Sequence, residues 1–406
     1  LARGREVLED FFPGLTEDLI ARGAVAGDPT RDVLWHCAGG FHARFASGLT
    51  GVLVSRPLLE AAIRARVLAL PNVAAIDDCD AIGLSVIEDR GRVSGIVVRR
   101  RATGAEEILA GDLVVDAGGR ASKSPAWLAA LGYEVPREEE VLVGIGYATR
   151  RFRRHPDDLG GALGMIVAAE PPNPSSAVAL AQEGDTWIVS AAGYAGRHPP
   201  ADADGFATFL RQVPCRAIHD LVHSAEPISD FATFNFPSSL RRRYEYLDRF
   251  PEGLLVFGDA ICRFNPVFGQ GMTVAALQAA ALSERLAAGR SDLARAFFRR
   301  AAKLIDVPWQ IAAGADLAHP GVVGRRGAMT RFFNWYIPRL HRAAHGDPAA
   351  SIAFHKVANL MAPPASILAP RIAWRVLRGN LALSRRRKPQ LRGAPRLASH
   401  RRGLDG

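Results

Sequence analysis

The feature that most constrains the fold is a strand, an acidic turn and a glycine-rich helix start in immediate succession. Gly253 to Phe257 reads Gly-Leu-Leu-Val-Phe, typical of a buried strand, and the Ala/Leu-rich run over residues 274–286 predicts a helix. Asp259 follows the strand directly, so its carboxylate can accept a hydrogen bond from a ligand hydroxyl. Gly269 and Gly271 allow backbone N–H groups at the helix N-terminus to approach an electron-rich ligand. The pattern therefore predicts an α/β protein with a ligand at this turn.

The stretch from Gly258 to Thr273 resembles the second FAD signature of class A flavoprotein monooxygenases, the aromatic-hydroxylase-like branch of the glutathione-reductase-type fold. The resemblance implies that Asp259 contacts the ribityl chain of FAD. A helix N-terminus near Gly271 would then stabilise negative charge on the reduced flavin ring. The alternative is an ordinary strand–loop–helix crossover in which Asp259 caps a helix. The cofactor-binding residues implied in this stretch are Gly258, Asp259, Pro266, Gly269, Gln270, Gly271 and Met272.

A second short strand, Leu113 to Val115, is followed by small residues that let a backbone come close to a ligand. It resembles the motif that ends a strand of the FAD domain in the same family, which implies that Ala117 and Gly119 are cofactor-binding. Ser122 also fits, whereas Gly118 stands where the family usually has Thr or Asp. This departure removes a side-chain oxygen near the cofactor.

Arg56 heads a helix predicted over residues 58–70. It resembles the family's arginine at a helix start, which implies contact with the ribityl or phosphate region of FAD. A cation at a helix N-terminus is unfavourable with the helix dipole, so we favour this ligand role over a surface salt bridge.

The chain contains no strand followed by G-x-G-x-x-G and a helix, the unit that seats the FAD pyrophosphate. It also begins at Leu1, directly inside a helical pattern. We therefore expect a fragment, or a mis-started reading frame, that lacks the N-terminal βαβ unit and by itself binds FAD weakly or not at all. A genuine truncated gene product is the other possibility.

The predicted fold class is α/β: a Rossmann-like FAD-binding domain lacking its N-terminal βαβ unit, with an inserted, mostly antiparallel substrate domain and a helical C-terminal region. Strand-like runs joined by Pro/Gly/Ser loops after residue 141 indicate the insertion. The expected parts are the FAD-binding domain over 1–135 and 245–300, the substrate-binding sheet over 136–244, the C-terminal helices over 301–380 and a basic disordered tail over 381–406.

Several finer elements are expected as well. Residues 73–76 have strand-like composition, and the runs 83–87 and 93–99 flank a tight turn typical of a hairpin. In the C-terminal helices, Pro308 and Pro338 are among the prolines expected to end a helix.

The net charge and the cysteine content restrict which binding partners and which cellular compartment we expect for this protein. Of the formal charge of +10, +7 falls in residues 381–406, so the body is nearly balanced and no nucleic-acid partner is predicted. At most, this tail gives weak peripheral membrane contact. The four cysteines are scattered without metal-ligand spacing, so we predict no metal site and a reducing compartment. No signal peptide or long apolar run is present, and we expect a cytoplasmic protein.

The resemblance implies an FAD-dependent oxidoreductase, foremost a monooxygenase that uses NAD(P)H and O2 to hydroxylate or epoxidise a hydrophobic small molecule. The alternatives are a reductase of the same fold, such as a prenyl-chain reductase, and a non-catalytic remnant. No catalytic acid or base is identifiable. Halogenating relatives need a Trp-x-Trp-x-Ile-Pro run and a catalytic lysine; the run is absent, and Lys123 is outside the expected place.

Overall fold

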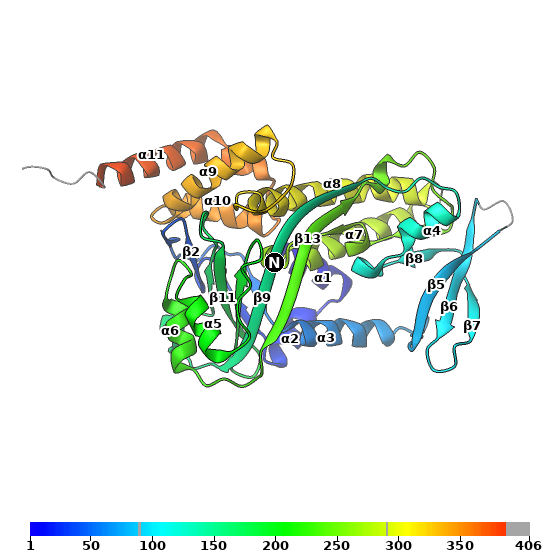
Figure 1. Ribbon diagram of the computed structural model, residues 1–406, viewed down its shortest axis with the longest axis horizontal. Helices are drawn as coiled ribbons and strands as arrows, with labels where there is room; N and C mark the ends of the chain where they lie inside the picture. Colours follow the sequence, from blue (N-terminus) through cyan, green and yellow to red (C-terminus); the bar gives the residue numbers. More distant parts are fainter. Residues whose placement is uncertain (88–90, 290, 387–406) are drawn as a thin grey trace, which may run out of the picture.

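The computed structural model describes residues 1–87, 91–289 and 291–386. An eight-stranded sheet lies at one end of the molecule and a three-stranded sheet at the other, with long helices running between them (Figure 1). The helices are α1 (Ala2–Phe11), α2 (Leu15–Ala21), α3 (Arg56–Leu68), α4 (Ser124–Ala130), α5 (Ala203–Leu210), α6 (Ala217–Ser224), α7 (Gly271–Ala287), α8 (Leu293–Asp316), α9 (Ala328–Ala344), α10 (Pro348–Ala358) and α11 (Pro370–Arg386).

The large sheet is antiparallel except where β10 runs parallel to β2. Its strands, in sheet order, are β15 (Cys262–Arg263), β13 (Ala232–Arg242), β9 (Glu138–Arg153), β12 (Thr186–Gly193), β11 (Ser175–Gln182), β10 (Gly164–Val167), β2 (Val33–Cys37) and β3 (Gly40–Phe41). Alternating small and bulky residues bury one face under α5 and α6, around Trp187 and Phe206. The sheet thus also takes in strands from outside the range 136–244.

The part that carries the two predicted ligand motifs is built around a parallel pair, β8 (Val114–Asp116) and β14 (Leu254–Val256). All three residues of β14 are fully buried, and the core around them includes Phe297 of α8. A three-stranded antiparallel sheet of β5 (Cys79–Val86), β6 (Val93–Arg100) and β7 (Glu106–Ala110) flanks it. A further pair joins β1 (Val25–Gly27) to β4 (Gly51–Leu53).

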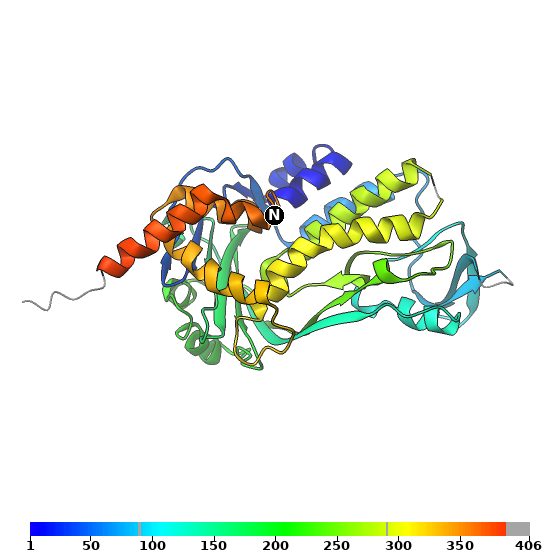
Figure 2. The same cartoon turned by 90° about the horizontal axis from the view of Figure 1, so that it is seen from above.

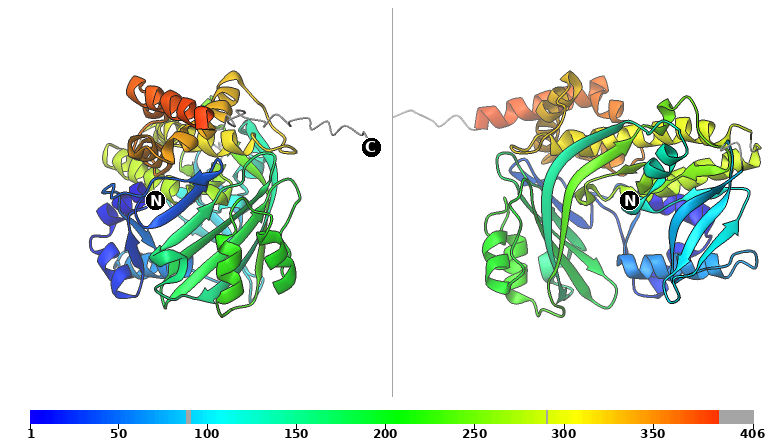
Figure 3. Two further views of the ribbon diagram at one scale, coloured as in Figure 1. Left: turned by 90° about the vertical axis from the view of Figure 1, so that its left-hand side faces the viewer. Right: turned by 45° about the vertical axis from the view of Figure 1, so that its right-hand side comes forward.

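Helices α9, α10 and α11 form a separate cluster that lies over the edge of the large sheet (Figures 2 and 3). Within α11, Ile372 and Val376 are buried in this cluster, whereas Trp374 and Leu377 are exposed. No helix in the described ranges is long and apolar enough to cross a membrane. Nearly all of the basic tail lies outside the described residues.

The coarse order of elements was predicted correctly, including the hairpin of β5 and β6, but two details were wrong. Residues 73–76 form no strand, and Val73 and Ile76 are exposed, because no neighbouring strand in the described chain accepts their backbone groups. Pro308 and Pro338 lie inside α8 and α9 and do not end them. Burial of these helices on the protein body offsets the one hydrogen bond that each proline removes.

Helix α1 packs so closely on α7 that a methyl group at Gly4 would lie 2.5 Å from Oγ1 of the buried Thr273. We expect Gly4→Ala to lower the free energy of unfolding by about 1–3 kcal/mol, because the added carbon overpacks this contact. Gly314→Ala is the matched control, since no atom lies within 4 Å of the methyl position there. It should stabilise α8 by about 0.5–1 kcal/mol. Denaturant unfolding of both variants checks the prediction; equal effects would contradict the close contact.

Candidate functional site

The carboxyl ends of β8 and β14 bring the two sequence motifs together. The strands run parallel with Asp116 opposite Val256, and the Phe257 N–H donates to the Asp116 carbonyl oxygen at 2.9 Å. One turn further on, a methyl group at Gly119 would lie 3.7 Å from Cβ of Asp259. Motifs far apart in the sequence therefore share one edge of the parallel pair, where open α/β folds bind their ligands.

Asp116 organises the turn after β8. Its carboxylate accepts hydrogen bonds from the Gly118 N–H at 2.9 Å, from the Ser122 hydroxyl at 2.6 Å and from the Ser124 hydroxyl. Gly119 has a φ of +59°, which a side chain would strain. These hydrogen bonds fix the backbone of residues 117–119, which places Gly119 beside Asp259.

The turn after β14 is pinned from α7 and ends in a left-handed residue. The Gly258 N–H donates to Oε1 of the buried Gln278 at 3.0 Å. Gly269 has a φ of +63° and closes the short helix Pro266–Phe268, after which α7 begins at Gly271. A methyl group at Gly271 would lie 3.8 Å from Oδ1 of Asp259, so the aspartate stands beside the N-terminus of α7.

Asp259 is exposed to solvent, but its surroundings still change the pKa of its carboxyl group. Desolvation raises the pKa of its carboxyl group, while Arg56 and Arg263 act in the opposite direction. Arg56 itself makes a surface ion pair with Glu60 at 2.7 Å and is 74% exposed. Its positive field thus reaches Asp259, and its role as a ligand to the cofactor stays a prediction.

Gln270 places a buried polar group at this turn. Its side chain is buried, and Oε1 has no hydrogen-bond partner among the described residues. Buried acceptors of this kind are costly unless something donates to them. The residues present therefore fit FAD: an unpaired amide oxygen, an aspartate at a strand end and glycines on both turns. Pro266 and Met272 are exposed beside them.

A large cavity begins at this turn. It has a volume of about 2040 Å³ and lies between the large sheet and helices α8, α9 and α10, and residues 266–270 form part of its wall. The volume exceeds the roughly 300–1,000 Å³ of an ordinary small-molecule site. Residues lining the cavity include Tyr147, Val167, Ala177, Ala192, Tyr194, Trp309, His319 and Phe333.

A buried polar network joins the turn to this cavity. Asn265, which directly precedes Pro266, is fully buried; its Oδ1 accepts from the Tyr147 hydroxyl at 2.6 Å and from the Val267 N–H at 3.2 Å. Its Nδ2 donates to Oδ1 of Asp316 at 2.8 Å and to the Tyr194 hydroxyl at 3.3 Å. The four contacts use the full hydrogen-bonding capacity of the amide and fix its orientation.

Asp316 is the titratable centre of this network. It is fully buried at the end of α8, and burial raises its pKa to about 7 despite its hydrogen bond with Asn265. The Tyr194 ring stacks on His319 at 4.2 Å between ring centroids. Burial raises the pKa of both tyrosines and lowers that of His319 to about 4. Asp316 is therefore the group here that gains or loses a proton near neutral pH.

No pattern in the sequence predicted this network. Asn265 lies within the recognised motif, but its partners come from β9, the end of β12 and the end of α8. Asp316 was not a candidate because nothing in a helical pattern reveals that one aspartate faces the interior. Cys262 is buried and free, consistent with a packed thiol.

Solved structures share this arrangement. The flavin-dependent brominase Bmp2 aligns with 94% of this chain and 87% of its own, at a TM-score of 0.62 and 14% identity. PqsL, a probable FAD-dependent monooxygenase from Pseudomonas aeruginosa, aligns with 87% of this chain and 88% of its own, at a TM-score of 0.53 and 17% identity. The chain thus has the fold of class A FAD-dependent monooxygenases and flavin-dependent halogenases.

Sequence comparison gives the family itself. The chain is 35% identical to Protein Rv3254 of Mycobacterium tuberculosis over 333 residues, which are 78% of this chain and 69% of that protein. It belongs to the same family as Protein Rv3254. No family model matches the chain.

Proposed function

We propose that the protein is an FAD-dependent oxidoreductase that acts on a hydrophobic small molecule. The observation that carries the proposal is that residues 266–270, the turn implied to hold the flavin, also form a wall of the large cavity. A molecule in the cavity would therefore contact the region where the flavin edge is expected. FAD, when bound, supplies the transfer of electrons and the activation of oxygen.

The residues of the chain divide the remaining tasks. Asp259 and the N-terminus of α7 would hold the ribityl chain and the flavin ring, and the buried amide of Gln270 would accept a hydrogen bond from the ring. The apolar walls around Trp309 and Phe333 favour a hydrophobic substrate and exclude water. With its pKa near 7, Asp316 can hold a proton next to Tyr147 and Tyr194, which line the cavity.

Within this class we propose a monooxygenase: NAD(P)H and O2 are consumed, one oxygen atom enters the substrate and the other leaves as water. A reductase of the same fold is the second candidate. A halogenase is less well supported, because no lysine is among the cavity-lining residues of the described chain. Lys123 lies on the surface, where its Nζ donates to the Ala81 carbonyl oxygen at 3.2 Å. We expect the protein to act in the cytoplasm.

The test is a turnover assay on protein reconstituted with FAD, using NADH or NADPH and a panel of hydrophobic aromatic and prenylated compounds. We expect one panel member to accelerate NAD(P)H oxidation and to acquire one ¹⁸O atom from ¹⁸O2. Saturation of a double bond without oxygen uptake would select the reductase. At millimolar FAD, NAD(P)H oxidation that no panel member accelerates would identify a non-catalytic remnant and overturn the proposal.

A further inference from the structure

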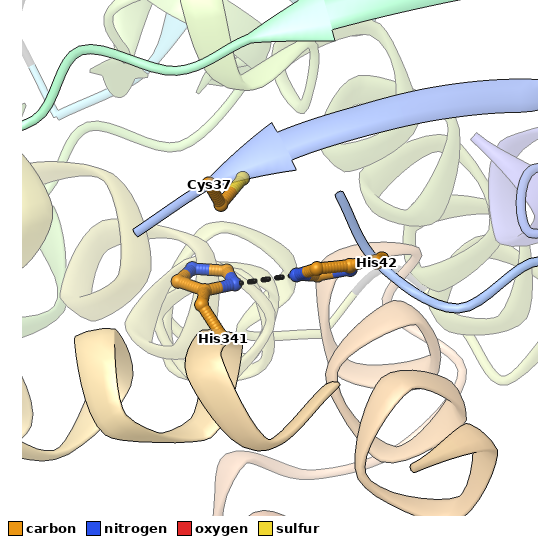
Figure 4. Close-up of side chains that lie close together, drawn as sticks. All are labelled: Cys37, His42 and His341. Carbon is orange, nitrogen blue, oxygen red and sulfur yellow. Dashed lines mark hydrogen bonds between the residues drawn. The ribbon is translucent and has the colours of Figure 1, made fainter. Parts of the chain in front are cut away.

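Three metal-ligating side chains meet where the edge of the large sheet contacts the C-terminal helices. Cys37 ends β2, His42 follows β3, and His341 lies on α9 (Figure 4). The Cys37 sulfur and one ring nitrogen from each histidine all lie within 4.8 Å of one another. Sequence spacing predicted no metal site, because His341 is about 300 residues from the other two.

The local fold holds these side chains in place. Ala38 and Gly39 have positive φ and turn the chain between β2 and β3, and the His42 N–H donates to the Trp35 carbonyl oxygen at 2.9 Å. The end of α9 is tied to the same hairpin: the Ala43 N–H donates to the Ala344 carbonyl oxygen at 2.8 Å. His345 Nε2 lies 2.8 Å from the Cys37 carbonyl oxygen. The β2–β3 hairpin and helix α9 are therefore held together without a metal ion.

The spacing of the donor atoms suits a small tetrahedral ion. Nε2 of His42 and Nδ1 of His341 are 3.0 Å apart. Two nitrogen ligands at about 2.0–2.1 Å from a tetrahedral zinc ion lie roughly 3.3 Å from each other, so a few tenths of an ångström of movement would admit the ion. The other nitrogen of His42, Nδ1, faces Nε2 of His355 at 3.4 Å. Such a second contact orients the ring of a metal-ligating histidine.

The cluster lies in the interior of the protein. Cys37 and His42 are 4% and 5% exposed. Neutral imidazole is the ligating form. Because the thiolate is the ligating form of cysteine, a bound ion would displace the proton of the Cys37 thiol, which is released to solvent. The acid Glu170 lies beside the β2–β3 hairpin, where its Oε1 accepts from the Gly39 N–H at 3.0 Å and lies 3.7 Å from Nδ1 of His36.

We propose that Cys37, His42 and His341 form a binding site for a divalent transition-metal ion of the zinc class. One sulfur and two imidazole nitrogens select Zn²⁺, Co²⁺ or Cu²⁺ over Mg²⁺ and Ca²⁺, which prefer oxygen ligands. Cys37 and His341 also line the large cavity, so a water molecule or a substrate group in the cavity could supply a fourth ligand. Three protein ligands and an open position characterise sites that bind water or a substrate group. The ion would tie α9 to the β2–β3 hairpin.

Cobalt titration of the metal-stripped full-length protein tests the site without reference to flavin or turnover. We expect one equivalent of Co²⁺ to bind, to give an intense near-ultraviolet sulfur-to-cobalt charge-transfer band, and to be displaced by Zn²⁺. The wild-type spectrum itself reports sulfur ligation, so the result does not depend on any variant folding. Absence of the band at saturating Co²⁺ would overturn the proposal.

Variants assign the ligands. Cys37→Ser should abolish the charge-transfer band, and His42→Gln and His341→Gln should each weaken Co²⁺ binding by at least about tenfold. Cys215→Ser and His223→Gln, which alter a half-buried thiol and an exposed imidazole elsewhere, should leave both unchanged. Zn²⁺ should raise the unfolding temperature of wild type and of Cys215→Ser but not of Cys37→Ser. A band that persists in Cys37→Ser would contradict the assignment.

Discussion

Replacing Asp316 with Asn should flatten the dependence of stability on pH between about pH 4 and 7. The folded-state pKa of Asp316 is raised from 3.8 to about 7 by burial. In that window the native protein binds a proton that the unfolded chain has released, so the contribution of Asp316 to stability is fully present at low pH and is lost as pH rises towards 7. Three pKa units correspond to at most about 4 kcal/mol. Asn keeps one oxygen for Asn265 and has no charge to bury.

Chemical denaturation at pH 4.5, 6, 7 and 8 measures this effect. Relative to wild type, Asp316→Asn should gain about 3 kcal/mol between pH 4.5 and pH 8, with most of the gain complete by pH 7. Asp230→Asn replaces an exposed carboxylate and serves as the control, with a difference from wild type that stays constant across the range. A parallel pH profile for Asp316→Asn and wild type would show that Asp316 is not the buried titrating group.

Removal of the Asp259 carboxylate should weaken FAD binding by about 10- to 150-fold. A hydrogen bond to a charged group contributes roughly 1.5–3 kcal/mol, and each 1.4 kcal/mol is a factor of ten in the dissociation constant. Asp259 stands beside the start of α7 and opposite Gly119, so its loss removes the acceptor that both turns surround.

Fluorescence titration of FAD into the wild-type and variant proteins gives the ratio of dissociation constants, whatever the absolute affinity. Asp204→Ala removes an exposed carboxylate from the first turn of α5 and is the matched control. Equal FAD affinity in Asp259→Ala and wild type would remove Asp259 from the site. A similar loss in Asp204→Ala would show that net charge, and not position, governs binding.

The sequence predicted the parts of the site that depend on local pattern. A buried strand followed by Asp259 and glycines, and another followed by Gly119, are readable because strand ends and helix starts impose residue types. Parallel pairing of β8 and β14 then places them together. Roles within the cofactor site remain predictions for all ten residues, including Arg56.

The features that the sequence did not reveal depend on distant contacts. Asp316 and Asn265 meet only because α8 crosses the sheet, and His341 meets Cys37 only because α9 docks on the β2–β3 hairpin. The strand predicted over residues 73–76 was wrong for a different reason. The composition of these residues favours a strand, but a strand also needs a neighbouring strand with which to pair. Periodicity reports which face of an element is apolar, and not what covers it.

Because β10 pairs in parallel with β2, the large sheet is complete only when two segments that are distant in the sequence come together. A segment from near the N-terminus completes a sheet whose other strands come mostly from residues 138–242. Excising that segment alone would leave β10 as an unprotected edge, open to pairing with another molecule. The chain must therefore close a long loop before the sheet is complete, and such non-local pairing slows folding. Exchanging the large sheet between relatives would require transferring residues 33–41 with it.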